Sequence, residues 1–387
     1  MEVKSVTVSD QEKVKLLSDL IAIQSVNDHE QVVADYIANY FDQHGIRSTQ
    51  VPVAPGRVNL VASIGSGQPT IVLSGHMDVV SPVEADRWQT DPFKLVEKDG
   101  RLYGRGTADM KGGLVDMMVA LVELKENNLL RKGTVKFMAT VGEEVGGAGS
   151  AVLQQKGYTK QIDALIVGEP SAKEIIFAHK GSMDIRLKSK GVAVHSSMPE
   201  RGYNALNPLI DILYWAKKDF ASVAVENSIL GPLVYNATIL NSGDQVNSLP
   251  DLAVAEINAR TIPEYNNDQV ASHLQKLINK VNTAGAHVNM DVYMSEWPVL
   301  KKADNKLTNL AQQVGRNILG IDYLKEPTGG VTDASNLLRD YQSSDFPFMM
   351  FGPGDYWEAH KINESVDKER FLRFSEVYED VVLGFLG

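Results

Sequence analysis

Short apolar strands alternate with amphipathic helices along much of this chain, and this alternation most limits the folds open to it. Strands are predicted at 134–141 and 164–167, and a helix at 114–125. A helix is also predicted at 16–23, where apolar residues recur at spacings of three and four. The run ALIV at 164–167 is apolar throughout, which is typical of a strand covered on both faces of a sheet. Further elements are predicted at 32–41, 59–64, 70–73, 307–318 and 348–351. Because strands that alternate with helices form layered α/β folds, we predict an α/β/α domain with a mixed sheet.

A second pattern occupies the middle of the chain. Residues 183–189 alternate apolar and polar side chains, as a half-exposed strand does. Together with the elements that follow, this strand gives the order β-α-β-β-α-β, which is typical of a small sandwich of one antiparallel sheet and two helices. The length of 387 residues also exceeds the roughly 250–300 residues at which single cores stop growing. We therefore predict a catalytic domain made of residues 1–180 and 295–387, with a smaller domain, 181–294, inserted into it.

Composition excludes several classes of protein. The chain has 38 basic and 49 acidic residues, a formal net charge of −11, which disfavours binding to nucleic acid or to anionic lipid. It has no cysteine, so disulfides, thiol nucleophiles and cysteine-ligated metals are excluded. Residues 1–13 are polar, without the apolar core of a secretory signal, and no apolar run approaches the roughly 20 residues that span a bilayer. We expect a soluble cytoplasmic protein.

The informative residues are acids and histidines placed just after predicted strands. His76 and Asp78 lie in the string SGHMDVV, and Asp109 lies in GRGTADMKGG, directly before a helix. The other members of this set are Glu143, Glu144, Glu169 and His360. Because ligands of open α/β sheets bind outside the carboxyl ends of the strands, we expect these side chains to converge on one cavity.

The charge of that cavity predicts what fills it. Asp78, Asp109, Glu143, Glu144 and Glu169 are five carboxylates, which repel one another unless cations are present or protons are taken up. Two divalent ions balance three ligating carboxylates and a bridging hydroxide. Imidazole and carboxylate ligands without thiolate suit zinc, with cobalt or manganese tolerated. Two such ions about 3.5–4 Å apart are a known hydrolytic arrangement.

Each of these residues also has an ordinary structural interpretation. A lone aspartate after a strand is usually a turn or cap residue, so Asp109 by itself is explained as a helix cap. Adjacent acids such as Glu143 and Glu144 are usually solvated, and isolated histidines are usually structural; we interpret His29, His44, His273 and His287 in that way. The joint occurrence of the set at strand ends favours a metal site.

The strings resemble the M20 family of dinuclear metallopeptidases and amidohydrolases over the whole chain. This family includes acetylornithine deacetylase, succinyl-diaminopimelate desuccinylase, aminoacylase, and di- and carboxypeptidases. The resemblance is carried by SGHMDVV, GRGTADMKGG, GEE, the glutamate of VGEP, the histidine of GVAVHSS, and His360. The string HKGSM at 179–183 and GVAVHSS at 191–197 look most like the Gram-positive branch of the desuccinylases.

The resemblance implies a role for each metal ligand. His76 and Glu169 resemble the ligands of one ion, Asp109 the carboxylate that bridges both ions, and Glu144 and His360 the ligands of the second ion. The family fold implied is a two-domain metallohydrolase in which the inserted domain serves as a lid and as a dimerisation domain.

The resemblance also implies roles for residues that do not ligate metal. Asp78 looks like the partner that fixes the orientation of His76, and Glu143 looks like the general acid/base. His195 resembles the residue that stabilises the oxyanion, often from the partner subunit of a dimer. Arg260 resembles the arginine that binds a substrate carboxylate, and Asn247 resembles a substrate-contacting residue. A loop histidine, a surface ion pair and a turn are the structural alternatives for these three.

The activity implied is hydrolysis of the amide bond of a small anionic N-acyl amino acid, with N-succinyl-LL-2,6-diaminopimelate first. N-acetylornithine, another N-acyl amino acid or a dipeptide stay open, because GGVTDASN at 329–336 departs from the GGTSDGR form common among the desuccinylases. An enzyme with only one ion bound and a non-catalytic metal-binding module are further alternatives. The resemblance also implies a homodimer formed through the lid domain.

Overall fold

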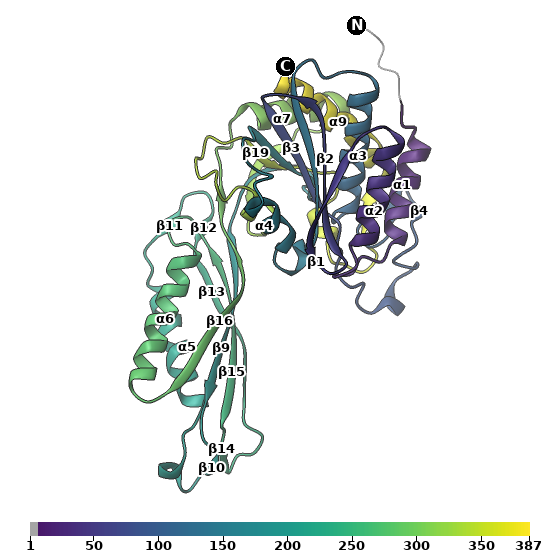
Figure 1. Cartoon of the computed structure of the whole chain (residues 1–387). Coiled ribbons are helices and arrows are strands. Elements are labelled where there is room, and N and C mark those ends of the chain that lie inside the picture. The colour runs from purple at the N-terminus through teal and green to yellow at the C-terminus, as the bar shows by residue number, and fades with distance from the viewer. Residues whose placement is uncertain (1–6) are drawn as a thin grey trace. The chain divides into compact units, whose positions relative to one another are not determined.

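The computed structural model describes residues 7–387, so residues 1–6 of the polar N-terminal stretch lie outside it. The chain divides into two compact units (Figure 1). The first contains the residues up to 178 together with 300–327 and 332–387, and the second contains 179–299 and 328–331. The sequence analysis places the insertion at 181–294. We describe each unit by itself.

The first unit is built on a nine-stranded mixed sheet. Its strand order is β1-β2-β6-β3-β7-β19-β8-β17, and β18 pairs with β8. Strands β6, β3, β7 and β19 are parallel to one another, and β2 is antiparallel to β6. The strands are β1 (Ser48–Ala54), β2 (Arg57–Ser66), β3 (Thr70–His76), β6 (Gly133–Thr140), β7 (Ala164–Val167), β8 (Glu174–His179), β17 (Val299–Leu300), β18 (Leu324–Thr328) and β19 (Phe348–Met350).

Helices cover both faces of this sheet. Alternate residues of β2 show this, because Leu60 joins the main hydrophobic cluster, whereas the side chain of its neighbour Asn59 donates to the main-chain oxygen of Gly149 in α4 (2.9 Å). One face carries α1 (Asp10–Ala22), α2 (Gln31–Gln43), α3 (Lys111–Glu126), α7 (Lys306–Leu319) and α9 (Lys368–Leu386), and the other carries α4 (Ala148–Gln155) with α8 (Ala334–Leu337) (Figure 1). The α/β/α layering predicted from the sequence is confirmed.

Several helices begin at an ordinary side-chain cap. The side chain of Ser9 accepts from the Glu12 main-chain N–H at the start of α1, Asn305 forms a capping box at the start of α7, and Asp367 accepts from the N–H of Arg370 at the start of α9. The sequence analysis did not predict α9. This helix packs against α3, α7 and α1, so its buried residues spread beyond one stripe and include polar ones such as Glu379.

The second unit has its own core and the predicted β-α-β-β-α-β order. Its antiparallel sheet has the order β13-β15-β9-β16, and the two helices pack on it. The elements are β9 (Gly181–Lys190), α5 (Leu206–Ala221), β13 (Val234–Ser242), β15 (Leu252–Thr261), α6 (Asn267–Thr283) and β16 (His287–Glu296). Two short pairs extend it: β10 (Val194–His195) with β14 (Ser248–Leu249), and β11 (Glu226–Asn227) with β12 (Gly231–Pro232).

A three-stranded sheet, β20-β5-β4, lies in the first unit. It joins β4 (Val96–Lys98) and β5 (Arg101–Tyr103) to β20 (Ser365–Asp367), close to the C-terminus of the chain. Short 3-10 turns complete the structure at Ala85–Arg87, Glu143–Val145, Pro199–Arg201 and Tyr356–Glu358. None of the helices between residues 7 and 387 combines the length and the apolar character needed to cross a bilayer.

Candidate metal centre

Three neighbouring parallel strands of the large sheet end in metal-binding residue types. His76 is the last residue of β3, Glu143 and Glu144 form the turn that follows β6, and Glu169 comes two residues after β7. In the sheet, β6 and β7 flank β3, so the three carboxyl ends lie at one edge. This pairing, which the sequence did not specify, brings together residues that are up to 93 positions apart.

Asp109 and His360 complete the group from two loops. Asp109 lies two residues before α3, and its Oδ1 is 3.0 Å from Nε2 of His76, while its Oδ2 is 3.4 Å from Nε2 of His360. Glu169 Oε1 lies 3.5 Å from His76 Nε2, and Glu144 Oε2 lies 2.9 Å from His360 Nε2. The carboxylate of Asp109 therefore lies between two pairs of side chains, His76 with Glu169 and His360 with Glu144. One of its oxygens faces each pair, as a bridging ligand requires.

Asp78 organises the turn that carries the two adjacent glutamates. Its buried carboxylate accepts from the main-chain N–H groups of Gly142 (2.9 Å), Glu143 (3.3 Å) and Glu144 (3.1 Å). The family resemblance implies a contact from this carboxylate to His76, but Nδ1 of His76 lies 3.8 Å from Asp78 Oδ1 and 2.9 Å from the Asp78 main-chain oxygen. The carboxylate of Asp78 is occupied by the three N–H groups of the turn. The atom of Asp78 that lies within hydrogen-bond distance of His76 is its main-chain oxygen.

Glu143 stands beside one half of the centre. A carboxylate oxygen of Glu143, one of Glu169 and a ring nitrogen of His76 all lie within 4.8 Å of one another. His76, Asp109 and Glu144 form a second group within the same limit. In this structure no hydrogen bond joins the carboxylate of Glu143 to another described residue. Glu143 can therefore face a molecule bound between the two groups.

The electrostatics show an excess of negative charge. Burial, reinforced by repulsion from Asp109 and Glu144, raises the pKa of Glu169 to about 8. Burial also raises the pKa of Glu143 well above its usual range, and the charge of Glu169 adds to the effect. Hydrogen bonds to Asp109 and Glu144 raise the pKa of His360 to about 10. The protein alone thus holds extra protons here, as expected where cations belong.

The residues present fit a pair of divalent ions. Two ligands of one tetrahedral zinc, each bound at about 2.0–2.2 Å, lie roughly 3.3 Å apart. The four distances from the two histidine Nε2 atoms to the carboxylate oxygens of Asp109, Glu169 and Glu144 run from 2.9 to 3.5 Å. Imidazole nitrogens and carboxylate oxygens, with no thiolate, are the ligands that zinc, cobalt and manganese accept. His76 is fully buried and Asp109 mostly so, which gives such ions a partly enclosed, preformed site.

Two glycines are needed for this packing. A Cβ at Gly113, in the first turn of α3, would lie 2.1 Å from the main-chain oxygen of Gly168, so only glycine lets the helix approach the segment that carries Glu169. Gly142 has a φ of +71° and begins the turn of Glu143 and Glu144. Both glycines therefore help to bring the candidate ligand side chains together.

Sequence reasoning missed several buried polar residues around the centre. The carboxylate of Glu364 accepts hydrogen bonds from the main-chain N–H groups of residues 106, 108 and 109, and it forms an ion pair with Arg105. Lys111 donates to the main-chain oxygens of Leu20 and Ile23 at the end of α1. Asp333, within GGVTDASN, accepts from the hydroxyl of Thr140 and lies close enough to help raise the pKa of Glu143. The one signal for Arg105, Lys111 and Asp333 was their position within strings already singled out, and Glu364 had none.

The three predicted substrate residues lie in the second unit. His195 in β10 pairs with Ser248 in β14, and the N–H of Ser196 donates to the main-chain oxygen of Asn247 (2.9 Å), so His195 and Asn247 share one small structure. Arg260 is half-buried in β15 and forms no ion pair or hydrogen bond through its guanidinium with any residue from 7 to 387. The surface ion pair considered for Arg260 is therefore not formed.

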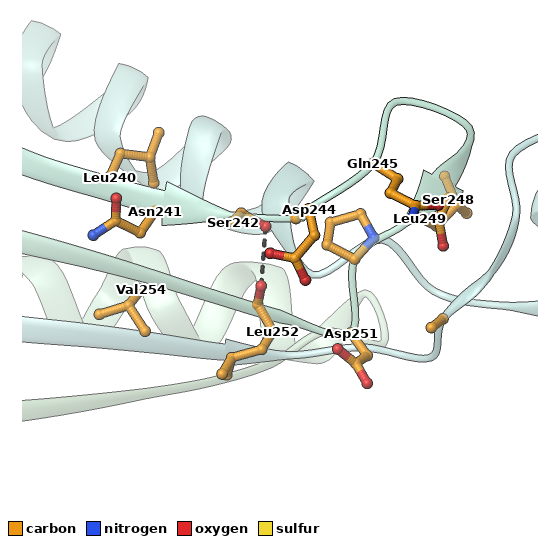
Figure 2. A pocket seen from close by; sticks show the side chains of 13 residues that line it. Leu240, Asn241, Ser242, Asp244, Gln245, Ser248, Leu249, Asp251, Leu252 and Val254 are labelled. Atoms are coloured by element: carbon orange, nitrogen blue, oxygen red, sulfur yellow. Dashed lines mark hydrogen bonds between the residues drawn. The ribbon is translucent and has the colours of Figure 1, made fainter.

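A polar hollow of 810 Å³ lies at the end of the second unit that carries these loops (Figure 2). Its lining includes Asp244, Gln245 and Ser248 on the β13–β15 connection, and Asp251 at the start of β15. The hydroxyl of Ser242 donates to the main-chain oxygen of Leu252 (3.0 Å) and closes the base of the connection. This connection also carries Asn247, so the hollow belongs to the structure that supports Asn247 and His195.

Fold and centre together define a class of protein. A layered α/β unit with a carboxylate set between two histidines at its strand ends is the construction of a metal-dependent hydrolase. Residues 72–384 match the sequence profile of peptidase family M20/M25/M40. The chain belongs to this family, and it is a metal-dependent amide hydrolase.

Particular relatives extend this finding. A Staphylococcus epidermidis protein named "Probable succinyl-diaminopimelate desuccinylase" is 38% identical over 403 residues, covering 98% of this chain and 99% of the relative. The M20 family metallo-carboxypeptidase Sso-CP2 from Sulfolobus solfataricus superimposes with a TM-score of 0.81 at 17% identity, covering 97% and 99% of the two chains. The Bacillus subtilis YXEP protein, described as a dinuclear metal binding peptidase of the M20 family, gives a TM-score of 0.68 at 17% identity, covering 97% and 98%. The two structures show a shared fold.

Proposed function

We propose that this chain hydrolyses the amide bond of an N-acyl amino acid, and that N-succinyl-LL-2,6-diaminopimelate is its substrate. The single observation that carries the reaction is the placement of Asp109 between His76 and His360, with Glu143 beside them. The substrate is supported by the name of the Staphylococcus epidermidis relative, which matches nearly the whole chain. Dipeptides, N-acetylornithine and other N-acyl amino acids are the competing substrates.

We assign the ligands of the two ions from the distances. His76 and Glu169 would hold one ion, Glu144 and His360 the other, and Asp109 both. Zinc is proposed first, with cobalt or manganese as substitutes. Two such ions, when bound, lower the pKa of water from about 15.7 toward 7 and polarise the amide carbonyl.

The protein supplies the proton transfers. No residue from 7 to 387 forms a hydrogen bond with the carboxylate of Glu143, so this group is available to accept the proton of the attacking water and then to deliver it to the leaving amine. Its elevated pKa, caused first by burial, matches a group that must hold a proton between these two steps. Asp78 holds the turn of Glu143 through main-chain hydrogen bonds and so fixes where this carboxylate stands.

We assign substrate recognition to the second unit. Arg260 has a guanidinium without a protein partner among the described residues, and such a group suits bidentate binding of a carboxylate. His195 accepts the N–H of Ser197 at Nδ1 (3.2 Å), which leaves Nε2 to carry the proton of the neutral ring and to donate to an oxyanion. Asn247 is proposed as a substrate contact because it is hydrogen-bonded to the segment of His195.

The second unit also supports the proposal of a homodimer. Strand β13 is an edge strand whose residues 236–241 are all exposed, including Ile239 at 48% and Leu240 at 44%. Helix α5, which packs against β13, exposes Ile210 and Tyr214. An exposed apolar edge strand pairs readily with a second chain. Ile239→Lys should therefore yield a monomer in sedimentation velocity, whereas Tyr293→Lys, on the opposite edge strand β16, should not.

A panel of substrates tests the proposed function. The purified protein, loaded with zinc or cobalt, is assayed on N-succinyl-LL-2,6-diaminopimelate, N-acetylornithine and dipeptides. We expect the highest kcat/KM for the first, and a fall of about 10- to 150-fold in Arg260→Ala, since hydrogen bonds to charged groups contribute about 1.5–3 kcal/mol. A higher kcat/KM on another substrate would replace the proposed one, and failure to cleave any amide would refute the proposal.

A further inference from the structure

Glu364 is a buried carboxylate whose contacts all lead to the metal centre. Its side chain is fully buried. Oε1 accepts from the main-chain N–H groups of Ala108 (2.8 Å) and Asp109 (3.0 Å), and Oε2 accepts from the N–H of Gly106 (3.0 Å) and from Nη1 of Arg105 (2.6 Å). Each of these four partners is a donor, so both oxygens of Glu364 act as acceptors.

These contacts join two segments that carry metal-binding residues. Glu364 lies four residues after His360, and its carboxylate grips the main chain of Asp109 itself. The main-chain oxygen of Glu364 also accepts from the N–H of Gly104 (3.0 Å), and β20, which starts at the next residue, pairs with β5. The segment of His360 is therefore clamped to the segment of Asp109 by a side chain and by main-chain pairing.

Arg105 makes the clamp reach His360 from the other side. Its guanidinium is 1% exposed, and Nη2 points to the main-chain oxygens of His360 and Ser81, each at 3.4 Å. The same guanidinium lies 5.2 Å from the centre of the Trp88 ring. The side chain of His360 is 53% exposed, so apart from Asp109 and Glu144 few described residues pack around its ring. The main chain of His360 has a φ of +63°.

We propose that Glu364, with Arg105, is a positioning residue that sets the spacing between Asp109 and His360 and so determines the affinity for the second ion. This inference rests on the proposed function, because it takes Asp109 and His360 as ligands. A buried carboxylate that accepts from three main-chain N–H groups holds those groups in one geometry, and one of the three is the N–H of Asp109 itself. Residues that orient metal ligands typically affect metal affinity by 10- to 100-fold when replaced.

The experiment is a titration of the metal-free protein with Co²⁺, followed by the visible absorption of the bound ion and by competition with a chelator. In Glu364→Gln, one carboxylate oxygen is replaced by an NH2 group, which cannot accept hydrogen bonds from the main-chain N–H groups. We expect the more weakly held ion to bind 10- to 100-fold less tightly and its absorption band to shift, with a circular dichroism spectrum like that of the wild type. The matched control is Glu123→Gln. Glu123 is a carboxylate that accepts from the N–H groups of Thr7 (2.9 Å) and Val8 (2.8 Å) and has no contact with the centre, so this variant should bind as the wild type does.

Two further variants keep the test decisive if Glu364→Gln does not fold. Glu364→Asp keeps the charge but shortens its reach, and Arg105→Lys leaves the three main-chain donors paired; both should weaken binding of the second ion, Arg105→Lys the less. Wild-type affinity and absorption in these variants would overturn the inference. If the wild type itself bound no Co²⁺, or Asp109→Asn left binding unchanged, the proposed function would fall instead.

Discussion

The adjacent residues Glu143 and Glu144 offer a sharp test of the site, because the same substitution should have two different outcomes. Glu144 Oε2 lies 2.9 Å from His360 Nε2, in the position of a ligand, whereas the carboxylate of Glu143 is free of hydrogen bonds to described residues. Glu143→Gln preserves the size of the side chain and removes its ability to accept a proton. General acid/base catalysis contributes about 10²–10⁴-fold, or roughly 2.7–5.4 kcal/mol of barrier, and kcat should fall by that factor.

Metal content separates the two variants. Glu143→Gln should retain about two ions per chain after dialysis, whereas Glu144→Gln replaces an anionic ligand by a neutral amide and should lose close to one ion. Elemental analysis, kcat at saturating substrate and circular dichroism together make the assay. Because Asp78 holds the main chain of both residues, the turn itself should survive each change. A Glu143→Gln enzyme within tenfold of wild-type turnover would refute the role of Glu143, and loss of metal in that variant with retention in Glu144→Gln would reverse the two assignments.

Three further outcomes are expected. Asp78→Asn leaves at least one buried N–H of the turn at Gly142 without its acceptor, so the urea midpoint should fall by the equivalent of about 2 kcal/mol. Metal affinity, measured by the Co²⁺ titration described for Glu364, should fall by 10- to 100-fold. Burial lowers the pKa of His179 to about 4, so this side chain stays neutral in the folded protein, whereas the unfolded chain takes up a proton below about pH 6.5. The free energy of unfolding should therefore decrease as the pH falls from 6.5 toward 4, by about 2 kcal/mol at pH 5. His179→Asn should reduce that loss in urea titrations at pH 7 and 5. Chelation should abolish activity and lower the thermal midpoint, since a ligand at 100 times its Kd contributes about 2.7 kcal/mol, and added zinc should restore both.

A specific result would contradict each of these three predictions. An Asp78→Asn protein with wild-type stability and metal affinity would show that the turn is held by other contacts. An equal loss of stability between pH 7 and 5 in His179→Asn and the wild type would place the titrating group elsewhere. Full turnover in the presence of excess chelator, with no metal detected in the protein, would contradict the whole account of the centre.

Periodicity was a good guide wherever an element buries one side or is wholly covered. The strand at 164–167 was predicted with its observed bounds, because an apolar run between polar flanks has few alternatives. Helix α9 was missed because it lies among three other helices and carries buried polar residues such as Glu379 and Arg370, which blur the apolar stripe. The M20 family and the hydrolase class, predicted from the strings, are confirmed by the profile match.

The residue types of the candidate centre were readable from the sequence, because several carboxylates and histidines, each just after a predicted strand, together favour a cation site even though each alone is usually a cap, a turn or a structural residue. Which of them share an ion could be predicted only from the family resemblance, and the distances between them could not be predicted, since these depend on β3 lying between β6 and β7 and on the loop of Asp109 reaching His360. Glu364 gave no signal at all: a buried acid has the same letter as a solvated one, and only its four donors, distant in the sequence, distinguish it. Chemistry of side chains is local and is written in the chain, whereas spacing between ligands is a property of strand pairing and of buried hydrogen bonds, which exist only once the chain has folded.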